Sequence, residues 1–155
     1  MKVALDYKEC VKQLLFQYEY FKDEDSEVAI TRQWFKGWTI SHDPYFLQSD
    51  PKLSIDLGGH KTIAAERGYE KIAVEIKSFV ADSQVVELEK AVGQYGIYQE
   101  LLQMQEPDRE LYLAVPIDAF ENIFSRQVGQ VAIKKFNLKL IVFSFSEEEL
   151  LWKLP

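Results

Sequence analysis

Two carboxylates and one lysine occupy positions from which they could together hold a divalent cation. Glu75 and Lys77 are two residues apart in an apolar run, and Asp56 ends an earlier apolar run just before a Gly-Gly pair. Side chains two residues apart on a β-strand point to the same face. Glu75 and Lys77 would therefore project together, away from the apolar residues that alternate with them: Ile72, Val74 and Ile76.

This combination of groups is suited to metal-dependent hydrolysis of phosphodiesters. Carboxylate oxygens bind Mg²⁺, and a bound divalent cation polarises water for attack. Lys77 would orient or help deprotonate that water, or stabilise charge developing on the phosphate. The alternative is an ordinary ion pair between Glu75 and Lys77 with Asp56 capping a turn, because Glu-x-Lys is common on solvated strand faces.

Composition sets the broad class of the protein. The chain has 155 residues, of which 47% are hydrophobic and 28% are charged, as expected for one globular domain with a sizeable core. No apolar run approaches the ~20 residues needed to span a bilayer, and the N-terminus lacks the apolar core of a secretory signal. The single cysteine, Cys10, excludes an internal disulfide and a cysteine-based zinc cluster. We therefore expect a cytoplasmic protein that does not span a membrane.

The formal net charge is −7. Proteins draw most of their affinity for nucleic acid from Lys and Arg side chains that neutralise phosphates. An acidic chain is expected to bind DNA weakly by itself. Contact with DNA would need a local basic surface or the help of a partner.

Hydrophobic periodicity and turn residues divide the chain into helices and strands. Helices are predicted at 1–23, 26–36, 83–104, 117–124 and 127–136, with Ser26 as an N-cap. Strands are predicted at 38–41, 53–57, 62–66, 71–77, 111–115 and 138–143. The last segment, 147–153, is expected to be a surface appendage. Gly93 and Gly96 weaken their helix intrinsically, so we expect them to allow close packing on the sheet.

These elements predict a mixed α/β fold. The strands at 53–57, 62–66 and 71–77 would form an antiparallel meander, and later strands would be added by a parallel crossover, with helices on both faces. The acids and Lys77 would then meet near one end of the sheet, under the helix that begins at Ser83. From that helix Gln94 and Tyr98, four residues apart, would point at the same pocket.

Several stretches in a fixed order resemble one known family. They are 37–44 (GWTISHDP), 55–58 (IDLG), 64–66 (AAE), 71–79 (KIAVEIKSF), 93–95 (GQY), 111–116 (LYLAVP) and 138–142 (LKLIV). Together they resemble the XisH family, the fdxN-element excision controlling factors of cyanobacteria. The resemblance covers about residues 26–153, so the whole chain would be one endonuclease-like domain (1–155) with 1–23 as a helical extension.

The resemblance also implies a site. The family is similar to the PD-(D/E)xK superfamily, whose core is restriction-endonuclease-like. By this analogy Asp56 is the first acid, Glu75 the second and Lys77 the motif lysine, with Asp56 and Glu75 as ligands of Mg²⁺ or Mn²⁺. Glu27 falls where an early helix often carries an additional acid, and Gln94 where a later helix often carries a polar residue.

Two functions follow from the resemblance, and the sequence leaves both open. The first is a Mg²⁺-dependent endonuclease acting on DNA during programmed excision of the fdxN element, alongside a recombinase. The second is a non-catalytic nuclease-fold scaffold that binds a XisI-like protein or the recombinase. Assembly into a homo-oligomer is also open.

Overall fold

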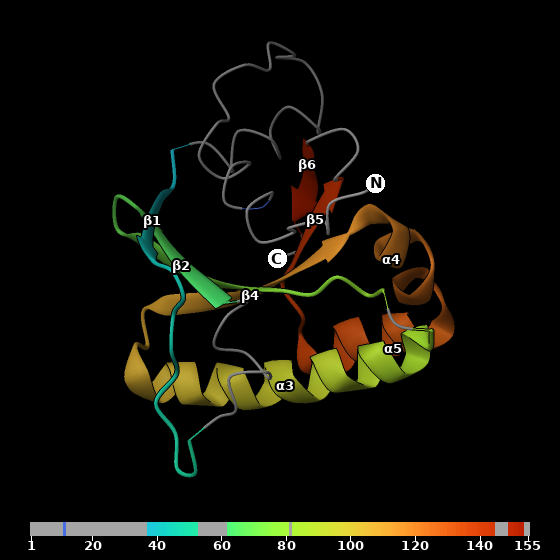
Figure 1. Cartoon of the computed structure of the whole chain (residues 1–155), viewed down its shortest axis with the longest axis horizontal. Coiled ribbons are helices and arrows are strands. Elements are labelled where there is room, and N and C mark those ends of the chain that lie inside the picture. Colours follow the sequence, from blue (N-terminus) through green and yellow to red (C-terminus); the bar gives the residue numbers. More distant parts are fainter. Residues whose placement is uncertain (1–10, 12–36, 53–61, 81, 145–148, 154–155) are drawn as a thin grey trace, which may run out of the picture.

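The structure is a computed structural model, and it describes residue 11 and residues 37–52, 62–80, 82–144 and 149–153 (Figure 1). The described residues contain a six-stranded sheet in the order β1-β2-β3-β4-β5-β6. The strands are β1 (Thr39–His42), β2 (Thr62–Arg67), β3 (Glu70–Ile76), β4 (Arg109–Pro116), β5 (Leu140–Ser144) and β6 (Glu149–Lys153). The helices are α3 (Gln84–Gln105), α4 (Ile117–Glu121), the 3₁₀ helix η2 (Ile123–Ser125) and α5 (Gln127–Phe136).

The predicted mixed α/β fold is confirmed. Strands β1, β2 and β3 pair antiparallel. Strand β4 then joins β3 in parallel through α3, and β5 joins β4 in parallel through α5. One detail differs: the strand beside β2 was predicted at 53–57, but in the structure β1 pairs with β2 at this edge. Residues 53–57 lie outside the described residues.

The expectation for the C-terminal segment was wrong. Residues Glu149–Lys153 form β6, which pairs antiparallel with β5. Only four residues, 145–148, separate the two strands in the sequence. Antiparallel backbone pairing with the adjacent buried strand explains why a run with only three apolar residues joins the sheet.

Helices α3 and α5 lie side by side along one face of the sheet (Figure 1). Ser83 caps α3 by accepting a hydrogen bond from the Val86 N–H at 3.3 Å. Buried residues recur along α3 at steps of three and four, which is the pattern expected of a helix packed on a sheet: Leu88, Ala91, Val92, Tyr95, Tyr98 and Leu102. No helix among the described residues is long and apolar enough to cross a membrane.

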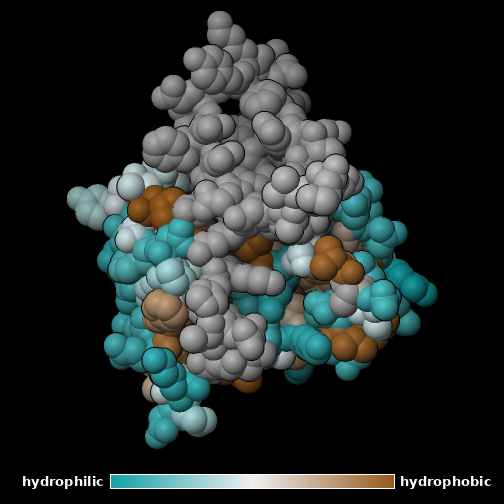
Figure 2. All heavy atoms as spheres, in the orientation of Figure 1, coloured by the Kyte–Doolittle hydropathy of each residue, from teal (hydrophilic) through white to brown (hydrophobic). Residues whose placement is uncertain are grey.

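The opposite face of the sheet has its own buried cluster, which includes Trp38 and Val74. Val11, from the first predicted helix, is fully buried in this cluster. The rest of the helices predicted at 1–23 and 26–36 lies outside the described residues. In the view of Figure 2, exposed hydrophobic residues form separate spots on the described surface, which is normal for a folded protein.

The two helical glycines of α3 do not lie against the sheet, contrary to expectation. A Cβ added at Gly93 would meet no atom within 4 Å among the described residues, and one at Gly96 would lie 3.8 Å from the Phe136 ring of α5. Gly129 of α5 is the crowded position. A Cβ there would collide with the carbonyl oxygen of Ile123 and the backbone of Phe124.

We therefore expect opposite effects from two glycine-to-alanine substitutions. Gly129→Ala should destabilise the protein by about 3 kcal/mol, because backbone atoms must move to admit the methyl group. Gly93→Ala should stabilise it by up to about 1 kcal/mol, because alanine is the better helix former and its methyl group meets open space. Thermal unfolding of both variants measures this. A Gly129→Ala variant as stable as Gly93→Ala would contradict the described packing of α5 on η2.

Arg109, a buried arginine that the sequence analysis did not identify, connects several elements at the end of the sheet where β4 begins. Only 1% of the Arg109 side chain is exposed. Its Nη1 donates to the Ile72 carbonyl oxygen at 3.0 Å, and its Nη2 lies 3.1 Å from carboxylate oxygens of both Glu66 and Glu106. Tyr45 donates to the second oxygen of Glu106 at 2.6 Å. This Arg109 cluster joins β2, β3, β4, the end of α3 and the segment after β1.

The cluster predicts how stability depends on pH. Hydrogen bonds from Tyr45 and Arg109 lower the pKa of Glu106 below 4.5. A lowered pKa means that the stabilisation is present above about pH 4.5 and is lost as pH falls through the lower value of the folded state. Glu106→Gln should therefore cost about 1–3 kcal/mol at pH 7, as expected for hydrogen bonds to a charged group. That difference should shrink as the pH falls below 4.5, and urea unfolding at a series of pH values measures it. A difference that stays constant would contradict this account.

Candidate functional site

Glu75 lies in the interior between the sheet and α3. Side chains alternate along β3, so that Ala73 packs with Tyr95 and Tyr98 of α3, while Val74 packs in the cluster on the opposite face. Glu75 is two residues from Ala73 and shares its face. Its side chain is 0% exposed. The Glu75 carboxylate therefore lies among the apolar residues of the larger core cluster, between the sheet and α3.

Lys77 follows directly after β3 and lies beside Glu75. The Lys77 backbone N–H donates to the Ala114 carbonyl oxygen at 3.0 Å, which extends the pairing of β3 with β4 by one residue. Its Nζ is 3.5 Å from Glu75 Oε1, and 17% of the side chain is exposed. The structure therefore brings together the two residues that the Glu-x-Lys pattern placed on one face.

Thr62 is a further residue at this position, and the sequence analysis missed it. It is the residue of β2 directly opposite Glu75, and it is 3% exposed. The turn at Gly68 and Tyr69 pairs Arg67 with Glu70. Counting back along both strands from this turn would have identified Thr62 from the sequence.

Helix α3 covers Glu75 with tyrosines. Burial raises the pKa of Tyr98 to about 12, and the negative charge of Glu75 contributes to that increase. Burial likewise raises the pKa of Tyr95 to about 12, with a smaller contribution from Glu75. The Tyr95 hydroxyl donates a hydrogen bond to the Leu111 carbonyl oxygen at 2.9 Å. This bond attaches α3 to β4. Both phenols are protonated at neutral pH.

Gln94 lies one helical turn before Tyr98, on the same side of α3. Its Oε1 is buried and has no hydrogen-bond partner among the described residues. Buried polar atoms are nearly always hydrogen-bonded, so such an oxygen calls for an explanation. A cation, a water molecule or a substrate group would provide one.

Two predicted site residues, Asp56 and Glu27, lie outside the described residues. The described part of the chain contains no group of three or more His, Cys, Asp or Glu side chains able to hold a metal ion. It does supply oxygen donors of the type that Mg²⁺ prefers, in the Glu75 carboxylate and the Gln94 amide. Mg²⁺ is commonly held by one or two carboxylates together with waters. These oxygen ligands fit Mg²⁺ if a second carboxylate, as predicted for Asp56, lies beside Glu75.

Comparison with known proteins identifies the family. The model of the XisH family, described as XisH protein, matches residues 23–151. The chain belongs to the XisH family. No curated protein matches it.

Two solved structures share the fold. An XisH family protein from Nostoc punctiforme is 33% identical, with a TM-score of 0.68 over 83% of this chain and 95% of that one. An fdxN element excision controlling factor protein from Anabaena variabilis is 29% identical, with a TM-score of 0.69 over 95% of this chain and 99% of that one. The family match, over residues 23–151, covers most of the chain and includes β3 and α3.

Proposed function

We propose that this XisH protein controls excision of an fdxN-type DNA element, and that it hydrolyses DNA phosphodiesters with Mg²⁺ at the site around Glu75. Membership of the XisH family supports the first part, as does similarity to an excision controlling factor protein. One observation carries the second part. The fully buried Glu75 carboxylate lies 3.5 Å from the Lys77 ammonium, on one face of β3.

Burial makes this pair more than a surface ion pair. Removing two charges from water is expensive, and packed apolar residues of similar volume are often as stable or more stable. Exposed pairs in this protein, such as Lys71 with Asp108 at 3.3 Å, have no such penalty. A buried acid beside a partly exposed lysine is therefore a candidate for chemistry.

The roles of the residues follow from their groups. Glu75 and Asp56 would hold the divalent cation, which would supply a polarised phosphate and an activated water when bound. Lys77 would orient the attacking water or stabilise charge on the phosphate. Gln94 would accept a hydrogen bond from that water or join the ligands. Tyr98, protonated at neutral pH, would donate a hydrogen bond to the acidic group it covers.

The net charge of −7 favours a second function. A chain this acidic is poorly suited to hold DNA by itself. In this alternative the protein is a non-catalytic scaffold that binds a XisI-like protein or the recombinase, and the buried Glu75–Lys77 pair fixes the fold.

Nicking of supercoiled plasmid separates the two functions. The protein is assayed alone and together with a XisI-like protein, in Mg²⁺, in Mn²⁺ and in EDTA. Nicking that requires the divalent cation supports the hydrolytic function. Absence of nicking in all conditions, with a stable complex between the two proteins, rejects it in favour of the scaffold.

A further inference from the structure

One segment of this acidic protein has a net positive charge because it lacks acidic residues. Residues 122–144 contain no Asp or Glu, although the chain as a whole has 25 acidic residues. The segment carries four cations: Arg126, Lys134, Lys135 and Lys139. Lys139 is paired with Glu110 at 3.2 Å. The Arg126 side chain is exposed and makes no hydrogen bond or ion pair with another described residue.

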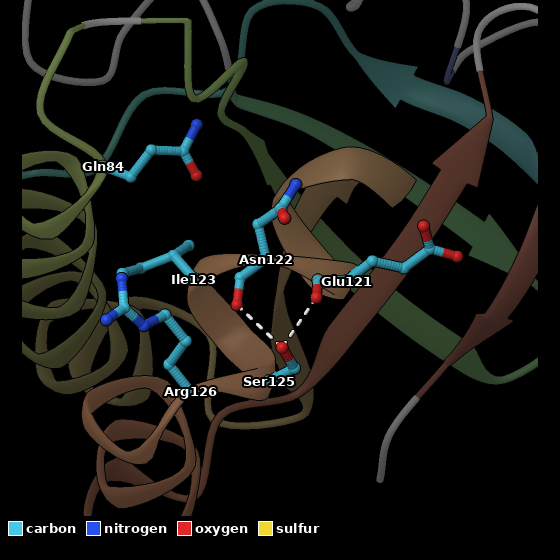
Figure 3. A pocket seen from close by; sticks show the side chains of 6 residues that line it. All are labelled: Gln84, Glu121, Asn122, Ile123, Ser125 and Arg126. Carbon is cyan, nitrogen blue, oxygen red and sulfur yellow. Dashed lines mark hydrogen bonds between the residues drawn. The ribbon is translucent and has the colours of Figure 1, made fainter.

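Arg126 borders a cavity. The cavity has a volume of about 450 Å³ and lies between the start of α3 and the turn that joins α4, η2 and α5. Figure 3 shows Gln84 reaching from α3 toward this turn, while Arg126 extends along Ile123 toward α3. Cavities of this size bind small molecules or parts of larger ones.

Three of the side chains around the cavity, those of Gln84, Asn122 and Arg126, can donate hydrogen bonds into it. Gln84 Nε2 donates to the Phe79 carbonyl oxygen at 2.9 Å, and Asn122 Nδ2 donates to the Asp118 carbonyl oxygen at 2.7 Å. Each amide nitrogen carries two hydrogens, so each has one further hydrogen to donate. The guanidinium of Arg126 adds five. The acid that also lines the cavity, Glu121, directs its carboxylate away from the other lining residues in Figure 3.

We propose that this cavity binds a phosphate group and that Arg126 is its cationic partner. A guanidinium matches the geometry of phosphate and forms paired, charge-assisted hydrogen bonds with it. The amide hydrogens of Gln84 and Asn122 complete a donor set around an anion, and the buried Oε1 of Gln84, which lacks a hydrogen-bond partner among the described residues, accepts from a protonated oxygen or a sugar hydroxyl.

The position of the cavity links it to the proposed function. The segment that leaves β3 at Lys77 reaches Gln84 seven residues later, a span of at most ~25 Å. Within that limit, a DNA strand whose scissile phosphate lies at Lys77 would place a phosphate a few nucleotides away in the cavity. This link rests on the proposed function. The binding itself does not, because a free phosphate compound has the same chemistry.

Binding measurements in EDTA test the proposal without any catalytic step. Fluorescence anisotropy follows a labelled DNA duplex at several salt concentrations, and calorimetry follows inorganic pyrophosphate. Arg126→Ala is compared with Lys71→Ala. The Lys71 substitution also removes one positive charge, but at the start of β3, whereas Lys77 follows the end of that strand. Arg126→Ala should weaken DNA binding about tenfold and reduce the salt slope by about 0.9, the value for one phosphate contact. Lys71→Ala should change affinity less than twofold.

The two ligands distinguish the possible sources of the phosphate. Loss of DNA binding in Arg126→Ala assigns the cavity to a phosphodiester, and loss of pyrophosphate binding alone assigns it to a free phosphate compound. If Arg126→Ala binds both ligands as Lys71→Ala does, or if the wild type binds neither, the proposal is wrong. Thermal unfolding shows that each variant is folded. Failure of nicking with DNA binding that still depends on Arg126 would reject the hydrolytic function and leave the phosphate site standing.

Discussion

Replacing Arg109 by methionine is expected to reduce the free energy of unfolding by about 3–5 kcal/mol, the usual effect of breaking a buried ion pair from one side. The guanidinium satisfies two carboxylates and the Ile72 carbonyl oxygen, and it lies 5.2 Å from the centre of the Tyr45 ring. Methionine fills much of the volume but leaves Glu66 and Glu106 without their cation. The loss should lower the midpoint of thermal unfolding by about 10 °C in a protein of this size.

The ion pair between Lys71 and Asp108 provides the control. It lies nearby, but both side chains are substantially exposed, at 35% and 64%. Lys71→Met should therefore change stability by less than about 1 kcal/mol. Urea unfolding of both variants measures the difference. Equal effects would show that the Arg109 cluster is no more important than a surface ion pair.

Substitution of the site residues is expected to have the largest effect on activity. Glu75→Gln and Lys77→Ala should each reduce Mg²⁺-dependent nicking by at least about 100-fold, in line with the loss of one group that acts on the transition state. Glutamine keeps the shape of Glu75 but removes the charge that would hold a cation. Alanine removes the ammonium group that lies 3.5 Å from that carboxylate.

A second Glu–Lys pair, formed by a residue of β4 and the residue before β5, is a matched control for this experiment. Glu110 and Lys139 lie 3.2 Å apart, with 56% of the Glu110 side chain exposed. Glu110→Gln and Lys139→Ala should leave nicking within about twofold of the wild type, since exposed pairs contribute little. Nicking that survives Glu75→Gln and Lys77→Ala would place the activity at another site.

Much of the fold was predictable because it depends on local patterns. The period of three to four residues in α3 and the Ser83 cap placed that helix correctly, and α5 was predicted with its observed bounds, Gln127–Phe136. The continuously apolar runs of β4 and β5 indicated buried parallel strands. Alternation along β3 also placed Glu75 and Lys77 on one face, which the structure bears out.

Other features depend on contacts between distant residues. Arg109 stands just before an apolar run, and nothing near it in the sequence indicates that Glu66 will lie beside it. The exposed side of α3 that carries Gly93 was predictable, in contrast, because Gly93 is aligned along the helix with Glu89 and Glu100. The convergence of Asp56 with Glu75 is likewise a long-range property, and it is still a prediction.

A crystal structure of the protein soaked with Mn²⁺ tests the proposed site most directly, because the anomalous signal locates the ion independently of any assay. We predict a peak about 2.0–2.6 Å from a carboxylate oxygen of Glu75, the range of divalent ion–oxygen bonds, with the Asp56 carboxylate as a second ligand. Crystals of Glu75→Gln should lose the peak. An Asp56 carboxylate directed away from Glu75, with no ion beside Glu75 at high Mn²⁺ concentration, would contradict the account.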